Sequence, residues 1–139
     1  MILVIRISGM INIPSEVNET LHRIRLRRKY AAVLLNNTKE NLKILKLLRN
    51  YVAFGEINQE TLKKLIKERA MPKDSKTKID ADKVAEGLDK KSLGDLGVKP
   101  FFRLHPPRGG IDAKKHFGVA KGVLGDNKEK INELVRRML

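Results

Sequence analysis

Three short apolar segments, separated by two stretches with helical periodicity, most constrain what this chain can fold into. The first segment, 2–8, alternates so that Leu3, Ile5 and Ile7 share one strongly apolar face of a strand. The other two are 30–36 and 51–57, both too brief for a helix and both rich in apolar residues. The order β-α-β-α-β, complete by Ile57, therefore predicts an α+β fold with a small sheet and both helices on one side.

The two intervening helices have recognisable starts. Ser15, after Pro14, is a plausible N-cap for a first helix that ends near Arg27 or Arg28. Asn37 and Glu40 resemble a capping box that opens a second helix through about Arg49.

The rest of the chain predicts an extension on this 1–57 unit. It begins after residue 57 and runs to the last residue, 139. Its expected elements are a helix over 59–70, a linker over 71–80, a short helix near 82–90, a strand over 101–104, a basic Pro/Gly surface loop over 103–125 and a helix over 126–138.

Positive charge is the strongest indication of function. The chain carries 30 Lys and Arg against 16 Asp and Glu, a net charge of +14 at pH 7. Residues 1–50 have 10 basic and 3 acidic side chains and residues 101–139 have 9 and 4, so these two segments hold most of the excess. Such a balance favours a polyanionic partner, with an acidic membrane surface as the less specific competitor.

The first basic cluster lies where the first predicted helix ends. It comprises Arg23, Arg25, Arg27, Arg28 and Lys29, and Lys46 and Arg49 extend it onto the second helix. Cations packed this densely repel one another unless an anion is near, and guanidinium groups match phosphate oxygens bidentately. A solvated helix end is the alternative reading.

A second cluster follows in the extension. It comprises Arg103, His105, Arg108, Gly109, Gly110, Lys114, Lys115 and Lys121. Pro106 and Pro107 restrict the backbone, the two glycines permit close approach to a partner, and the charged side chains supply hydrogen bonds along it. We expect two separate RNA contacts from these clusters, although a plain connecting loop explains the Pro and Gly residues equally well.

Signals for catalysis, metal or cofactor are poor. The chain has no cysteine, and its three histidines lack the spacing of metal ligands. The glycine-rich stretch 118–125 matches neither the P-loop nor the dinucleotide fingerprint. Because these signals are poor, we expect no small-molecule substrate. Arg6 interrupts the apolar N-terminus and no apolar run is long enough for a membrane span, so we also expect neither a signal peptide nor membrane association.

Two motifs together resemble a known family. They are Tyr-Val-Ala-Phe-Gly-Glu-Ile at 51–57, followed by Gln-Glu-Thr-Leu at 59–62, and Arg-Leu-His-Pro-Pro-Arg-Gly-Gly at 103–110. In this order and at this distance they resemble large-subunit ribosomal protein L-thirty in its long archaeal form, whose eukaryotic relative is L-seven.

The resemblance covers essentially the whole chain and implies a fold and a partner. It implies a three-stranded antiparallel, ferredoxin-like sheet with two helices on one face, in residues 1–57. It also implies a structural role in the cytoplasmic large ribosomal subunit, binding 23S ribosomal RNA near 5S ribosomal RNA and adjoining other ribosomal proteins. Residues 58–139 would be the extension shared by archaeal and eukaryotic forms.

Two other function classes remain open from the residues alone. A basic chromatin protein that binds duplex DNA would share the charge. A small phosphatase on a ferredoxin-like sheet would need an Arg and Asn pair in a phosphate-cradling loop, and the loop 9–14 offers Asn12 without an Arg.

Overall fold

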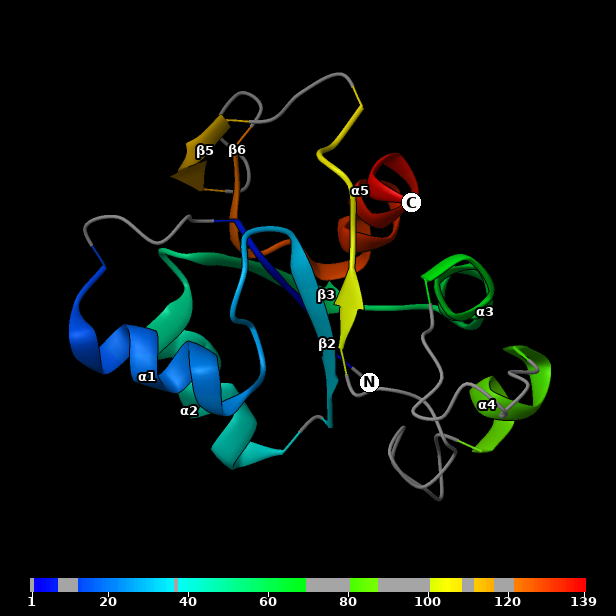
Figure 1. The fold of residues 1–139 in the computed structure, drawn as a ribbon, viewed down its shortest axis with the longest axis horizontal. Coiled ribbons are helices and arrows are strands. Elements are labelled where there is room, and N and C mark those ends of the chain that lie inside the picture. The colour runs from blue at the N-terminus through cyan, green and yellow to red at the C-terminus, as the bar shows by residue number, and fades with distance from the viewer. Residues whose placement is uncertain are drawn as a thin grey trace.

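The computed structural model describes residues 2–7, 13–36, 38–69, 81–87, 101–108, 112–116 and 122–139. The strands and helices alternate along most of this length, and one mixed sheet runs through the middle of the molecule (Figure 1). The α+β class expected from the sequence is therefore confirmed.

The centre of the sheet is the antiparallel trio expected from the three apolar segments. Strand β1 (Ile2–Arg6) lies between β2 (Ala31–Leu35) and β3 (Val52–Glu56). Val4 is the register partner of Val33 on one side and of Phe54 on the other. Because β-branched and aromatic side chains pack well on a pleated surface, these cross-strand pairs fix the register of the trio.

The sheet is larger than the predicted three strands, which is a correction to the sequence-based fold. Among the described residues it has six strands, in the order β4-β2-β1-β3-β6-β5. The added strands are β4 (Phe102–Arg103), antiparallel to β2, β6 (Gly122–Asp126), parallel to β3, and β5 (Asp112–His116), parallel to β6. All three come from the extension, so residues beyond 57 complete the sheet.

Strand β5 and all but the last residue of β6 fall inside 103–125, where the sequence predicted a surface loop. That expectation is wrong for β5 and β6, and Val123 and Leu124 in β6 are buried in the core. The strand expected over 101–104 is confirmed as β4. The apolar pair Val123 and Leu124 is too short, between two glycines, to indicate a strand from the sequence. The strand is stabilised by parallel pairing with β3, which is far away along the chain.

Helices α1 (Ser15–Arg23) and α2 (Lys39–Leu48) cover one face of the sheet, as predicted (Figure 1). Their apolar sides, with Leu21 and Leu45, pack with Ile2, Val4 and Val33 in one buried cluster. The predicted caps differ: Pro14 occupies the N-cap position of α1, and the Thr38 side chain caps α2 by accepting a 3.2 Å hydrogen bond from Asn41 N. Asn37 lies outside the described residues.

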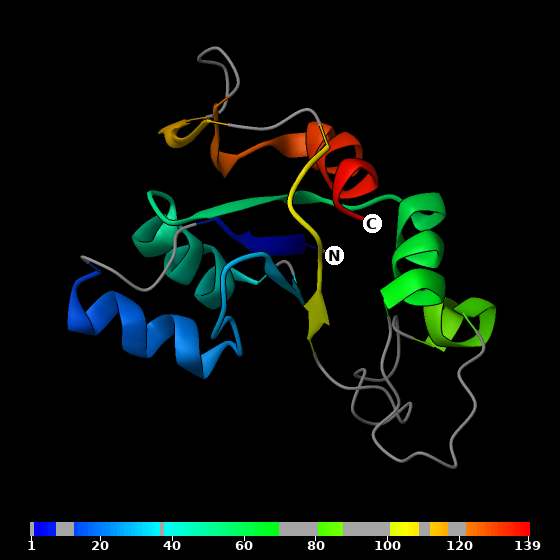
Figure 2. The same cartoon turned by 45° about the horizontal axis from the view of Figure 1, so that its top comes forward.

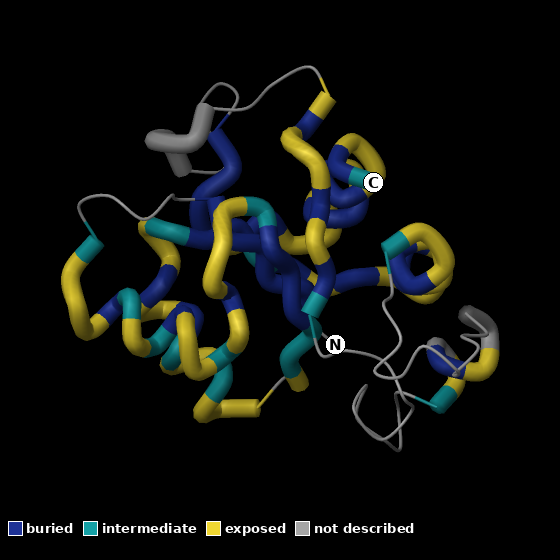
Figure 3. The backbone as a smooth tube through the Cα atoms, viewed as in Figure 1, coloured by how far each residue is buried: buried dark blue, intermediate teal, exposed yellow. Residues whose placement is uncertain are grey.

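The opposite face of the sheet is covered by α3 (Gln59–Arg69) and α5 (Ile131–Met138), with α4 (Ala81–Gly87) beside α3 (Figures 1 and 2). Leu3, Ile5 and Ile7 pack there with α3 and α5 side chains. Both faces of β1 are consequently buried, whereas the sequence indicated one strongly apolar face, and the burial map shows this continuous interior (Figure 3).

The C-terminal helix starts later than predicted. A short 3-10 turn over Lys128–Lys130 separates β6 from α5, so Asp126 ends a strand and does not begin the helix. The turn approaches β3 closely at Gly55, where a Cβ atom would lie 2.8 Å from the Ile131 Cβ and closer still to the Lys128 carbonyl oxygen. Glycine is required at this contact because no side chain fits.

Candidate nucleic-acid interface

The first basic cluster lies on an exposed turn between α1 and β2. α1 ends at Arg23, earlier than predicted, because the chain reverses there: Leu26 N donates to Leu21 O at 2.8 Å. Arg25 and Tyr30 have φ values of 69° and 65°, a left-handed conformation that bounds the turn at both ends. Within it the predicted cations Arg23, Arg25, Arg27, Arg28 and Lys29 are all exposed. We call residues 23–29 the arginine turn.

A buried arginine in β1 supports the arginine turn from beneath. Arg6 is fully buried, and its Nη1 donates a 2.7 Å hydrogen bond to the carbonyl oxygen of Leu26, itself a core residue. The Arg6 carbonyl accepts a 2.7 Å bond from Tyr30 N, at the other end of the turn. Burial lowers the pKa of Arg6 below its ordinary value, yet a guanidinium stays charged at neutral pH. Both the middle and the end of the turn are thus tied to one residue.

The arginine turn forms one wall of a pocket of about 220 Å³. The residues that line it are Arg25, Arg27, Arg28, Ala31, Phe101 and Arg103. The segment that contains strand β4 supplies the last two, and Arg103 is the register partner of Ala31 in β2. The Arg103 Cζ lies 5.7 Å from the centroid of the Phe101 ring, within the range of a cation–π contact. We call this the arginine pocket.

The arginine pocket brings together residues that the sequence assigned to two separate contacts. Arg103 and Arg28 are far apart along the chain, and the β2–β4 pairing places both on one pocket. The expectation of two separate surfaces is therefore wrong for Arg103. Strand pairing between short segments so far apart has no local sequence signal.

The pocket is strongly electropositive and has an aromatic side chain in its wall. Four guanidinium groups line it, and none of the described residues around it is acidic. Guanidinium groups bind phosphate oxygens with paired hydrogen bonds and stack on planar rings. The arrangement is therefore suited to an anionic ligand that also carries a planar group.

The other residues predicted for the second cluster lie elsewhere or outside the described part. His105 and Arg108 are exposed, and their backbone N–H groups donate to the carbonyls of Met138 and Arg137, so this stretch follows α5. They do not line the arginine pocket. Lys114 and Lys115 lie in β5, where only the backbone is described. Gly109, Gly110 and Lys121 lie outside the described residues.

Lys46 and Arg49, predicted to extend the first cluster, are exposed at the end of α2. Neither residue lines the arginine pocket. They lie on the side of the sheet that α1 and α2 cover, and the C-terminal end of α1 leads into the arginine turn (Figure 1).

Two residues of this region were not singled out from the sequence: Phe101 and Arg6. A signal for Phe101 was present, because alternation along Phe101-Phe102-Arg103-Leu104 puts Phe102 and Leu104 on one face, which is buried, and Phe101 with Arg103 on the other. Alternation puts Arg6 on the face of β1 opposite to Leu3, Ile5 and Ile7, and nothing in the local sequence distinguishes a buried arginine there from an exposed one.

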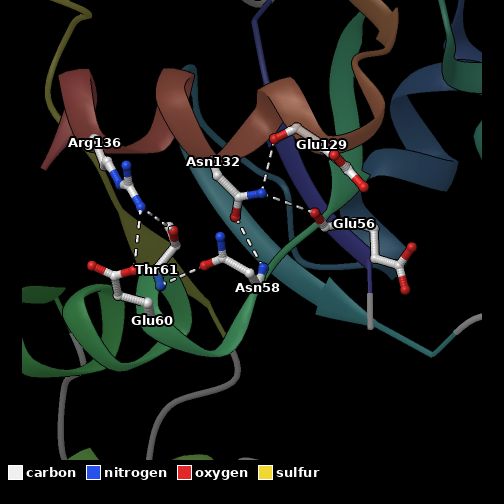
Figure 4. Close-up of polar contacts among 7 residues, drawn as sticks. All are labelled: Glu56, Asn58, Glu60, Thr61, Glu129, Asn132 and Arg136. Atoms are coloured by element: carbon white, nitrogen blue, oxygen red, sulfur yellow. Dashed lines mark hydrogen bonds and ion pairs between the residues drawn. The ribbon is translucent and has the colours of Figure 1, made fainter.

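A second polar region, between α3, α5 and the end of β3, has a different character (Figure 4). The buried Asn132 side chain accepts a 3.0 Å hydrogen bond from Asn58 N and donates to the carbonyls of Glu129 at 2.8 Å and Glu56 at 3.3 Å. The hollow beside it, of about 580 Å³, has mixed charge, with three glutamates beside one lysine and one arginine. This network stabilises the fold and offers no concentrated positive charge.

Within the described ranges, no group of three or more potential ligands is placed to hold a metal ion. None of the helices in these ranges has both the length and the apolar composition of a membrane span.

The chain is similar to known ribosomal proteins. Residues 2–52 match the model of the family described as Ribosomal protein L30p/L7e. Over nearly its whole length the chain is also similar to archaeal proteins named large ribosomal subunit protein uL30. It is 36% identical to that of Archaeoglobus fulgidus (99% of both chains), 35% to that of Aeropyrum pernix (98% of this chain, 97% of the relative) and 32% to that of Methanosphaera stadtmanae (all of both).

Proposed function

This chain belongs to the ribosomal protein L30p/L7e family, whose members are structural and not enzymatic, and we propose that it is a constituent of the large ribosomal subunit that binds ribosomal RNA through the arginine pocket. The observation that carries the proposal is the convergence of four exposed arginines, from two segments far apart in the chain, on one pocket with no acidic residue among its described lining. Relatives of nearly equal length bear the name of a large-subunit protein, which supports the same assignment.

The RNA we propose is 23S ribosomal RNA, at a position near 5S ribosomal RNA, in cytoplasmic ribosomes and beside neighbouring large-subunit proteins. Contacts outside the pocket would come from the remaining predicted residues: Arg23, Lys29, Lys46, Arg49, His105, Arg108, Gly109, Gly110, Lys114, Lys115 and Lys121. Residues 1–57 would form the primary RNA-binding unit and residues 58–139 the archaeal and eukaryotic extension.

Binding of this kind is physically driven by charge. With +14 net charge, the chain attracts RNA over a Debye length, and each phosphate neutralised by an arginine releases condensed counterions. Phosphate contacts fix the position and orientation of the protein, and they require no chemistry from it. The protein would thereby hold adjacent RNA segments in place during subunit assembly and translation.

Sedimentation tests the proposal. A tagged wild-type chain, expressed in its source cells, should co-migrate with large subunits on a density gradient and remain there after a wash in moderate salt. A variant with Arg25, Arg27 and Arg28 replaced by Ala should be found mainly at the top of the gradient if it folds normally. Migration of the wild-type chain with the nucleoid fraction, or with neither particle, would contradict the proposal and favour the DNA-binding class.

A further inference from the structure

Resting on the proposed function, we propose that the arginine pocket seats one unpaired nucleotide of the RNA, with its base against Phe101 and Arg103 and its phosphate on the arginine turn. The proposal therefore concerns the kind of RNA bound: a bulge, loop or other single-stranded segment, and not the outer backbone of a continuous helix.

The size of the pocket supports a single nucleotide. With a volume of about 220 Å³ it is a small hollow, closer in scale to a single flat base than to the surface of a helix. In an A-form helix the bases are stacked and paired, and only phosphates and the shallow groove reach a protein surface. A hollow of this size gains contacts only from a base that has left the stack.

The chemistry of the pocket matches the two halves of a nucleotide. Phe101 is partly buried, Ala31 is buried, and the Arg103 guanidinium lies over the Phe101 ring. Aromatic rings and guanidinium planes are the surfaces on which single-stranded bases stack. Arg25, Arg27 and Arg28 line the same pocket from the arginine turn and present cations to the phosphate.

The pocket is also held in place before any ligand binds. Tyr30 and Arg25 are fixed in left-handed conformations, Arg6 bonds to the middle and the end of the arginine turn, and Arg103 is held by strand pairing. Preorganisation of this kind lowers the entropy cost of ordering the site on binding. An acidic peptide would satisfy the arginines but would make little use of the aromatic wall, so a nucleotide fits the whole pocket better.

The test compares two defined RNA probes with the full-length protein. The probes are a short single strand of uridine and a blunt RNA duplex of matched total charge, each titrated over a range of salt concentrations. Phe101→Leu keeps the apolar volume and removes the ring, and Arg103→Lys keeps the charge and removes the planar guanidinium. Because stacking does not depend on phosphate number, both variants should bind the single strand about tenfold more weakly with an unchanged salt slope, and the duplex within about twofold of wild type.

The outcomes separate this inference from the proposed function. If both variants bind both probes as wild type does, or lose affinity equally for both, the nucleotide pocket is overturned while RNA binding stands. If the wild-type protein binds neither RNA, or binds polyglutamate more tightly than either, the proposed function fails as well. Thermal unfolding of each variant checks its fold, and Arg103→Lys, an exposed and conservative change, decides the matter if Phe101→Leu unfolds.

Discussion

Arg6 and Leu26 are joined by a 2.7 Å hydrogen bond between a fully buried guanidinium and a backbone carbonyl at the middle of the arginine turn. The bond links the central strand of the sheet to the exposed turn that carries the first basic cluster. A charged group with no exposed area is costly to bury unless it is hydrogen-bonded, and the Leu26 carbonyl accepts one of its hydrogen bonds.

Replacing Arg6 by Met should destabilise the protein and loosen the arginine turn. The Leu26 carbonyl would lose its donor in a buried environment, at a cost of about 1–3 kcal/mol in the free energy of unfolding. Urea denaturation measures this cost, and amide hydrogen exchange at Leu26 and Tyr30 should become faster. Arg27→Met, on the exposed part of the turn, is the control and should stay within about 0.5 kcal/mol of wild type. Equal stability of the two variants would argue against a supporting role for Arg6.

Gly55→Ala should destabilise the contact between β3 and the turn that precedes α5. The new methyl group would overlap the Lys128 carbonyl and approach the Ile131 Cβ to 2.8 Å, so the turn must shift, at about 1–3 kcal/mol. Urea denaturation should show a lower midpoint. Glu56→Ala, at the exposed neighbouring position, should change the midpoint little. A wild-type midpoint for Gly55→Ala would mean that the approach is looser than the structure has it.

Much of the fold could be predicted from the sequence because its main signals are local. Strand β1 alternates with a period of two, β2 and β3 are short apolar segments too brief for a helix, and α1, α2 and α3 have a period of 3.6. β5 and β6 could not be predicted in the same way, because their stability depends on pairing with β3 and with each other. Burial of both faces of β1 could not be predicted for a similar reason, because the helices α3 and α5 that cover its second face come from the extension.

The candidate site, like the fold, could be predicted only where its signals are local in the sequence. The arginine turn was visible as a dense run of cations, and its exposure agrees with that reading. The junction with Arg103 and Phe101 was not visible, because it depends on the register between β2 and β4. Local composition thus indicated which residues carry the charge, and only the tertiary structure indicated which of them line one pocket.

Asn132→Asp should destabilise the seam between α5 and the end of β3. A carboxylate cannot donate to the carbonyls of Glu56 and Glu129, which would cost about 1–3 kcal/mol. The negative charge near the N-terminus of α5 stabilises the helix by only about 0.3–1 kcal/mol, so the free energy of unfolding should fall overall. Denaturation at pH 7 and at about pH 4, near the ordinary pKa of Asp, should show a smaller loss at the lower pH, because a protonated carboxyl regains a donor. A loss that grew on acidification would contradict this account.

Arg28 and Arg103 should be energetically coupled in RNA binding because they line one pocket. In filter-binding measurements with 23S ribosomal RNA, the effects of Arg28→Gln and Arg103→Gln should depart from additivity by about 0.5–2 kcal/mol. The pair Lys46→Gln and Arg103→Gln, in which Lys46 lies outside the pocket, should be additive within about 0.5 kcal/mol. Additivity of both pairs would restore the view of two independent contacts.

The salt dependence of binding to 23S ribosomal RNA is the most direct test that the arginine turn contacts phosphates. Replacing Arg25, Arg27 and Arg28 by Ala should reduce the slope of log affinity against log salt by about two to three. The matched control replaces Lys64, Lys67 and Lys83, on α3 and α4, by Ala, and so removes the same number of positive charges from another surface. Its slope should stay close to that of wild type. An unchanged slope in the arginine variant, or an equal reduction in both variants, would contradict the account.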